Sequence, residues 1–346
     1  MATTMKQATL VVLVFNFFYV QKEDHPDARV TGNLVYSPKT NSLLLIDGYT
    51  KHPADGKNNV YSWNGKQWKR IDVSGPDSKS LSTAAVDKKT NDILVFGGIG
   101  RKGYESLRGD TWRFNGTRWA QIKTNDIGTR DHCKMVYAAN LDAFVMYGGQ
   151  NEKRKGDSST WILKNGEWKE MKIDGPGSRF HFGMAYDNLR SKVVLYGGYN
   201  GRGLQQDTWE FDGEKWKLIT SAGPGPRGRF SMVYDEDQKL VILFGGDVWK
   251  KKVDTTVSAD GELWDIRSDT WAWNGNTWKQ ISDTGPARML AALGYDPSRG
   301  KLVLYGGGDA FQISYADTWE FEKDKWIKVT DNGAWKWNGS DYEKVK

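Results

Sequence analysis

Pairs of aromatic residues seven positions apart recur along the whole chain, and they predict its architecture. The seven pairs are Tyr61/Trp68, Trp112/Trp119, Trp161/Trp168, Trp209/Trp216, Trp271/Trp278, Trp319/Trp326 and Trp335/Tyr342. Most pairs enclose a dipeptide such as Asn64-Gly65 or Asn274-Gly275, whose residue types allow the positive φ angles of a tight hairpin turn. Each pair therefore predicts one β-hairpin.

The hairpins belong to a repeat of about 50 residues. The first members of the first six pairs are separated by 51, 49, 48, 62 and 48 residues, a period typical of solenoids, propellers and arrays. Ahead of the hairpins, a β-rich run ends in a glycine pair, as in residues 93–98 and 193–198, and another short strand precedes it, as in residues 183–187. One unit therefore predicts four antiparallel strands.

Such four-stranded units, with a glycine pair closing the second strand and aromatic residues in the third and fourth, resemble kelch repeats. Residues 175–187, 193–198 and 207–211 carry the resemblance most clearly, and six consecutive units cover residues 29–330. The similarity is to the bacterial style of these repeats and to the central domain of galactose oxidase. It implies an all-β, kelch-type β-propeller of four-stranded antiparallel blades. It implies a fold and not a function, since propellers include binding modules and enzymes.

The two ends of the chain leave the number of blades open. Residues 331–346 repeat only the third and fourth strands of a unit, because Trp335 follows Trp319 by 16 residues. The apolar run within residues 1–28 could supply a missing strand and close a composite seventh blade. We prefer this arrangement, six full repeats plus a partial seventh; a six-bladed ring with a spare hairpin is the alternative.

The same N-terminal run also fits a secretory signal peptide. A secreted or periplasmic location and a cytoplasmic one therefore both stay open. No stretch of 18 apolar residues occurs, so we expect no membrane-spanning helix.

Composition narrows the class of protein. The single cysteine, Cys133, excludes an intrachain disulfide framework. The net charge of +6 is modest for 346 residues, and no base-stacking motif accompanies it, so we expect no nucleic-acid partner. We expect one monomeric propeller domain, in which the strand-three tryptophans, such as Trp209, pack between blades.

A column of basic residues recurs at the entry to the first strand of each unit. Its members are Arg29, Lys79, Arg130, Arg179, Arg227 and Arg288. The first strand of a propeller blade is the innermost, so these residues should ring the channel mouth on the face with the long, variable loops. There they would attract carboxylate, sulfate or phosphate groups. The alternative is a structural role, in which they stack on aromatic rings or pair with carbonyl and carboxylate groups between blades.

A second column, two residues later, varies from unit to unit. It contains Thr31, Leu81, His132, His181, Arg229 and Leu290. We add Arg229 to the predicted ligand-binding residues, together with Trp249 and Trp264 of the long fifth loop, because aromatic rings beside cations suit acidic glycans or acidic protein segments.

Evidence for catalysis is weaker. His132, His181 and Tyr104 are the candidates for acid–base chemistry, but no motif of fixed spacing supports them. Three or four converging ligands are needed for a metal, and the copper radical oxidases with a similar propeller require a Tyr-His dipeptide that this sequence lacks. We therefore expect no metal and no cofactor.

These observations favour a non-catalytic recognition module that binds an anionic glycan or an acidic protein segment at the long-loop face and channel mouth. The alternative is a carbohydrate-active enzyme of the lyase or epimerase type that uses the same mouth. Some propeller lyases and a kelch-type sialic-acid epimerase use histidine, tyrosine and arginine in this way.

Overall fold

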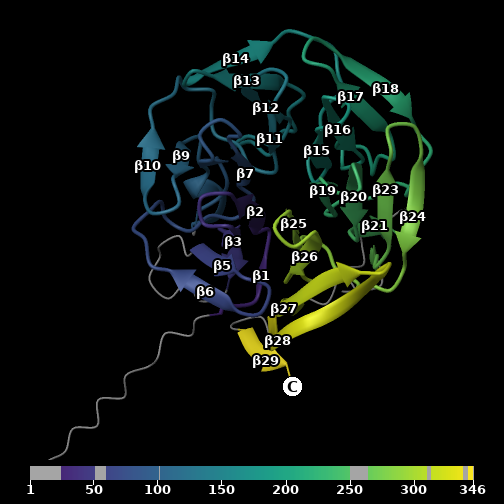
Figure 1. Cartoon of the computed structure of the whole chain (residues 1–346). Helices are drawn as coiled ribbons and strands as arrows, with labels where there is room; N and C mark the ends of the chain where they lie inside the picture. Colours follow the sequence, from purple (N-terminus) through teal and green to yellow (C-terminus); the bar gives the residue numbers. More distant parts are fainter. Residues whose placement is uncertain are drawn as a thin grey trace, which may run out of the picture.

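A ring of six antiparallel β-sheets surrounds a central axis (Figure 1). The computed structural model describes residues 25–50, 60–100, 102–249, 264–309, 313–337 and 342–345. Within these residues each sheet is built from consecutive strands, so each repeat of the sequence forms one blade. The propeller predicted from the repeats is confirmed.

The strands of the blades are as follows. Blade 1 contains β2 (Asn33–Ser37), β3 (Ser42–Ile46), β5 (Val60–Trp63) and β6 (Trp68–Ile71). Blade 2 contains β7 (Thr83–Val86), β8 (Ile93–Phe96), β9 (Thr111–Phe114) and β10 (Trp119–Ile122). Blade 3 contains β11 (Lys134–Ala138), β12 (Ala143–Tyr147), β13 (Thr160–Lys164) and β14 (Glu167–Met171).

The second half of the ring follows the same order. Blade 4 contains β15 (Gly183–Asp187), β16 (Lys192–Tyr196), β17 (Thr208–Phe211) and β18 (Trp216–Thr220). Blade 5 contains β19 (Ser231–Asp235), β20 (Leu240–Phe244), β23 (Thr270–Trp273) and β24 (Trp278–Ser282). Blade 6 contains β25 (Ala292–Asp296), β26 (Lys301–Tyr305), β27 (Ile313–Glu322), β28 (Lys325–Trp337) and β29 (Tyr342–Val345).

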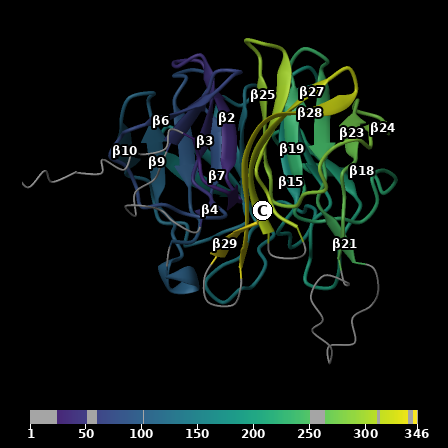
Figure 2. The ribbon, with the colours of Figure 1, turned by 90° about the horizontal axis from the view of Figure 1, so that it is seen from below.

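The first strand of every blade is the innermost: β2, β7, β11, β15, β19 and β25 surround the axis (Figure 1). Short elements extend the loops at one face, namely β1 (Arg29–Val30) paired with β4 (Tyr49–Thr50), β21 (Asp247–Trp249) paired with β22 (Trp264–Ile266), and the 3-10 helix η1 (Gly103–Ser106). Seen from the side, β4 and β21 lie toward this long-loop face (Figure 2). The short turns of the blade hairpins lie at the other end.

Tryptophans of the fourth strands join neighbouring blades. The Trp216 indole N–H donates to Thr160 Oγ1 of the preceding blade at 2.9 Å, and Trp278 and Trp326 make the same bond to their preceding blades. Trp68 donates to Thr318 at 2.8 Å, so blades 1 and 6 close the ring by the same contact. Among the described residues, the equivalent indole N–H groups of Trp119 and Trp168 are buried without such a partner. The strand-three tryptophans, expected to fill these interfaces, lie half-buried against the same apolar clusters.

The seven-bladed arrangement is not formed, and the six-bladed alternative is confirmed. Residues 331–337 continue β28 instead of starting a new blade: Ala334–Lys336 pair with Ile313–Tyr315 at the start of β27. β29 then pairs with this extension as a fifth strand. The apolar N-terminal run that was expected to supply a closing strand, or a signal peptide, lies outside the described residues, apart from residues 25–28.

Candidate functional site

The column of six basic residues lies behind the channel wall. Their exposed fractions are 2–8 %, and five of the six pair with a carboxylate that lies in or shortly before the third strand of their own blade. The pairs are Lys79–Asp110, Arg130–Asp157, Arg179–Asp207, Arg227–Asp269 and Arg288–Asp317. The sixth, Arg29, donates to the Asp47 carbonyl at 3.1 Å and lies over the Tyr61 ring.

The contacts of Arg179 show how a member of this column can stabilise its blade. Its guanidinium holds both oxygens of Asp207, at 2.7 and 2.6 Å, and also donates to the carbonyls of Gly197 and Pro176. Asp207 accepts a further hydrogen bond from Trp209. Burial alone would raise the pKa of Asp207, but the hydrogen bonds from Arg179 and Trp209 outweigh it and lower the pKa. These contacts support the structural alternative for the column, and direct contact with a ligand stays a prediction.

The variable second column forms the constriction of the channel. All six members have left-handed φ angles of 52–63°, a conformation that is uncommon for residues other than glycine. Four backbone hydrogen bonds of 2.7–3.1 Å link neighbouring members: Thr31 to Leu290, His132 to Leu81, Arg229 to His181 and Leu290 to Arg229. The backbone is therefore the same at every position, while the side chains are free to differ.

The constriction has a polar half and an apolar half. Blades 3, 4 and 5 contribute His132, His181 and Arg229, whereas the other blades contribute Thr31, Leu81 and Leu290 around the same cavity. The two imidazole rings meet edge to face, with centroids 4.1 Å apart. Burial first, and then repulsion from His132, Arg229 and Lys134, hold the pKa of His181 well below its usual range. His181 is therefore neutral at pH 7.

His132 lies against a buried carboxylate. Its Nδ1 is 2.9 Å from Oδ1 of Asp131, whose side chain is fully buried. Burial, and then the nearby charge of Asp131, raise the pKa of Tyr104 from η1. Arg154 of the third long loop lies over the Tyr104 ring at 4.2 Å. The long-loop mouth of the channel thus brings together three catalytic candidates that are distant in the sequence, His132, His181 and Tyr104.

Arg229 occupies the other side of the polar half. Its Nη1 is 3.2 Å from Oδ2 of Asp247, and its guanidinium lies 4.4 Å over the Trp264 ring. Burial raises the pKa of Asp247 to about 6, although the charge of Arg229 opposes the shift. Trp249 pairs with Trp264 in the β21–β22 ladder, and its side chain lies outside the described part of the structure. Two of the predicted ligand-binding residues, Arg229 and Trp264, therefore meet.

Comparison with known proteins assigns the fold to a family. The family model described as "Attractin/LZTR1 beta-propeller" matches residues 43–311. The chain belongs to this family. The solved structure entitled "Structure of YjhT" has 13% sequence identity and a TM-score of 0.67, and the match covers 93% of this chain and 99% of that chain. The comparison with curated proteins found no significant match.

Membership of the Attractin/LZTR1 propeller family establishes the kelch-type fold, and the chemistry must be argued from the site itself. Within the described ranges, no group of three or more His, Cys, Asp or Glu side chains is arranged to hold a metal ion. Burial raises the pKa of Cys133, beside His132, to about 12, so this thiol stays protonated. The described ranges also contain no helix that is long and apolar enough to cross a membrane.

Sequence reasoning missed three charged residues at or near the channel, namely Asp131, Lys134 and Asp247, whereas the basic run 153–155 of the third loop was noted as part of a candidate basic rim. Asp247 follows the glycine pair of its repeat, at a position occupied elsewhere by residues such as Ile99 and Tyr199. This departure from the repeat could have marked Asp247 as a candidate functional residue. Asp131 could have been noted for the same reason, because it is the only acidic residue at its position in the six units.

Proposed function

We propose that this propeller is a non-catalytic recognition module that binds an anionic ligand at the long-loop mouth of its channel. One observation carries the proposal: three successive blades place His132, His181 and Arg229 side by side on one half of the constriction. Arg229 is the cation of this set that a ligand would meet, because its side chain is 26 % exposed. A planar guanidinium can hold a carboxylate or sulfate by two hydrogen bonds.

The surroundings of Arg229 favour an acidic sugar over an acidic peptide. The Trp264 ring lies against its guanidinium, and the rings of Phe180 and Tyr199 pack together with centroids 4.9 Å apart beside His181. Aromatic faces next to a cation suit a sugar ring that carries a carboxylate. Recognition of an acidic protein segment is the other outcome that the experiment can return.

The test compares two arginine variants of the full chain. Glucuronate, sulfate and acidic peptides are screened by thermal shift, and acidic glycans are screened on an array. Arg229→Gln should abolish the stabilisation by the anion, whereas Arg202→Gln, an exposed position on the long loop of blade 4, should keep it. Retained binding by a folded Arg229→Gln protein would refute the proposal.

The buried basic column should respond differently. Arg179→Gln leaves Asp207 buried without its charged partner, so it should lower the melting temperature strongly. If Arg179→Gln instead keeps its stability and loses anion binding, then the buried column contacts the ligand directly.

A second candidate function is a carbohydrate-active enzyme of the lyase or epimerase type. The proximity of the Asp131 carboxylate to Nδ1 of His132, at 2.9 Å, favours it, because a carboxylate beside an imidazole stabilises the protonated ring that forms when the imidazole accepts a proton. Proton exchange at the carbons of an acidic sugar, followed by NMR in D2O, tests this function. Turnover that is lost in His132→Gln and kept in Arg202→Gln would establish catalysis; no exchange at any pH would leave recognition alone.

A further inference from the structure

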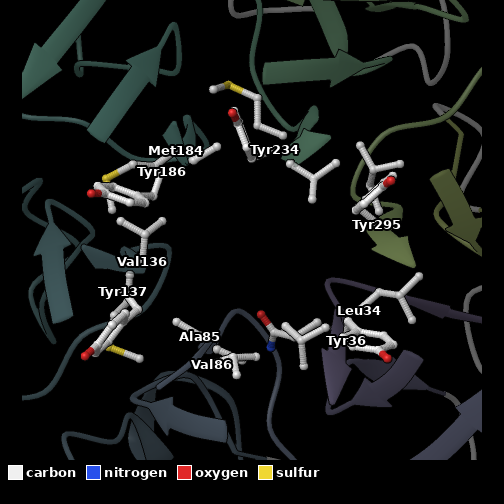
Figure 3. Close-up of a pocket in the computed structure, with 18 of the residues that line it drawn as sticks. Leu34, Tyr36, Ala85, Val86, Val136, Tyr137, Met184, Tyr186, Tyr234 and Tyr295 are labelled. Atoms are coloured by element: carbon white, nitrogen blue, oxygen red, sulfur yellow. The ribbon is translucent and has the colours of Figure 1, made fainter. Parts of the chain in front are cut away.

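The central channel continues beyond the constriction to the short-turn face, where it widens into a cavity of about 280 Å³. Alternate residues of an innermost strand face the same side, so the lumen is lined in layers. The layer nearest the short turns is apolar and contains Val35, Ala85, Val136, Ala185 and Val233. Ala85 and Val136 point toward the centre of this ring, whereas the hydroxyl groups of the surrounding tyrosines point away from it (Figure 3).

Three of the tyrosine hydroxyls have hydrogen-bond partners outside the lumen. Tyr36 donates to Asn41 at 2.6 Å, and Tyr186 donates to Asn140 of the preceding blade at 2.9 Å. Tyr234 accepts from the Leu189 backbone N–H. These three hydroxyls are therefore not directed at a ligand. A ligand would meet hydrocarbon at the layer of Val35, Ala85, Val136, Ala185 and Val233, and polar side chains such as Lys88, Asn188 and Glu236 at the mouth.

Lys134 is a cation at the end of the short-turn cavity that adjoins the constriction. Lys134 borders both the short-turn cavity and the constriction around His132. Other polar side chains at its level have partners: Asn33 donates to Ser82 at 3.0 Å, and Ser231 donates to the Ala291 carbonyl at 2.5 Å. Among the residues that the structure describes, the ammonium group of Lys134 has no hydrogen-bond or ion-pair partner, although its backbone pairs with Tyr147 in the β11–β12 ladder.

The Lys134 side chain is half-buried, so its ammonium group faces the lumen partly removed from bulk water. Burial lowers the pKa of Lys134, and a counter-charge beside the ammonium would offset that cost. A ligand could pair a negatively charged group with Lys134 and pack an apolar segment against the layer that contains Val136.

We propose that the short-turn half of the channel is a second binding site, for a straight-chain carboxylate whose charged group pairs with Lys134 and whose hydrocarbon chain fills the lumen beside Val136. The strand runs about 10 Å from Lys134 to Tyr137 at ~3.3 Å per residue. An extended chain of about eight carbons has this length. The site is separate from the anion site at Arg229, although the two share the wall of one channel.

A ligand that enters from the short-turn face must pass an ion pair at the mouth of the channel. Lys88 Nζ of blade 2 lies 2.9 Å from Glu236 Oε1 of blade 5, and these blades are opposite each other in a ring of six. Both residues line the cavity. Their side chains are 49 % and 36 % exposed, so the pair is weak and can separate to admit a chain.

Binding of octanoate, octan-1-ol and acetate to the full chain, measured by isothermal titration calorimetry, tests the proposal. Octanoate should bind, acetate should bind far more weakly, and each methylene added from butanoate to octanoate should tighten binding about fourfold, or about 0.8 kcal/mol. Lys134→Met should weaken octanoate binding at least about tenfold, as expected for a hydrogen-bonded charge pair. Binding of octan-1-ol should stay unchanged.

Three further variants make the result decisive. Lys169→Met, at an exposed position on the outer strand of the same blade, should behave as the wild type. Val136→Phe narrows the lumen and should weaken octanoate and octan-1-ol alike, while Arg229→Gln should leave both unchanged. Affinity that does not depend on chain length, or octanoate binding that survives in a folded Lys134→Met protein, would overturn the proposal. Loss of octanoate binding in Arg229→Gln would place the carboxylate at the other mouth and overturn it equally.

Discussion

Asp247 should compete with the anion that we propose Arg229 binds, because both would pair with the same guanidinium. Its carboxylate lies 3.2 Å from the Arg229 guanidinium and is almost fully buried, and burial raises its pKa to about 6. With that pKa, roughly nine tenths of the groups are ionised at pH 7 and roughly one tenth at pH 5. An anion that binds well only when Asp247 is neutral should therefore bind about tenfold more tightly at pH 5 than at pH 7, a difference of about 1.4 kcal/mol.

The Asp247→Asn variant isolates this effect. It should bind glucuronate about tenfold more tightly than the wild type at pH 7, with little further gain at pH 5, in calorimetric titrations at fixed ionic strength. A matched control is Asp265→Asn, because Asp265 is exposed on the same hairpin and pairs with Arg267; it should follow the wild type.

The variant should also fold. A carboxyl group whose pKa is raised in the folded state adds stability as pH falls through about 6, and its ionised form opposes folding above that pH. Asp247→Asn should therefore not lower the melting temperature at pH 7. An unchanged affinity in a folded Asp247→Asn protein would show that Asp247 does not compete with the ligand.

The other predictions concern the scaffold and the channel. Trp216→Ala removes a buried side chain and its bond to Thr160, so the free energy of unfolding should fall by roughly 3–5 kcal/mol in urea titrations; a loss below about 1 kcal/mol would contradict interblade packing. The pKa of Asp207 is lowered in the folded state, so its stabilisation should disappear as pH falls below about 4, and Asp207→Asn should flatten that part of the pH–stability profile. Glu236→Gln breaks the ion pair with Lys88 and should speed octanoate association by at most about fivefold with little change in stability; slower association would contradict its role at the mouth.

The blades were predictable from the sequence because the signals that form them are local. Turn dipeptides such as Asn64-Gly65 and the paired tryptophans each act within one hairpin, and the glycine pairs have the positive φ angles that their position requires. Because the same local pattern occurs six times, the sequence predicts six similar blades that stack side by side. The interblade contacts, such as Trp216 to Thr160, then follow from stacking identical units.

The C-terminal hairpin was assigned to the wrong place for a related reason. Its residues resemble a third and a fourth strand, but that local pattern does not specify which strand they pair with. The pairing depends on Ile313–Tyr315, which lengthen β27 beyond the blade and provide an edge for Ala334–Lys336. Such a pairing between an extended loop and a chain end cannot be recognised from the periodicity of either segment.

The positions of the candidate residues were predicted in part, and their role in binding stays a prediction. His132, His181 and Arg229 line the channel cavity as expected, since each lies just before the start of an innermost strand. The direction of the side chains was harder to foresee: Arg227 turns into the blade to meet Asp269, whereas Arg229, two residues later, reaches the constriction. The left-handed φ of Arg229 breaks the simple alternation of a strand at this point.

The two neighbouring columns explain how one scaffold can carry a variable site. The buried cations pair with carboxylates of their own blade, as in Arg227 with Asp269. Their positive charge is therefore neutralised within the blade and contributes little to the field in the channel. Four of the links around the constriction are backbone hydrogen bonds that do not depend on the side chain, as between Arg229 and His181, while the Leu81 N–H donates to the Thr31 side chain. The same φ accommodates threonine, leucine, histidine and arginine. Substitutions that alter ligand binding at the constriction can therefore occur with little effect on the blades, which is the property a recognition surface requires.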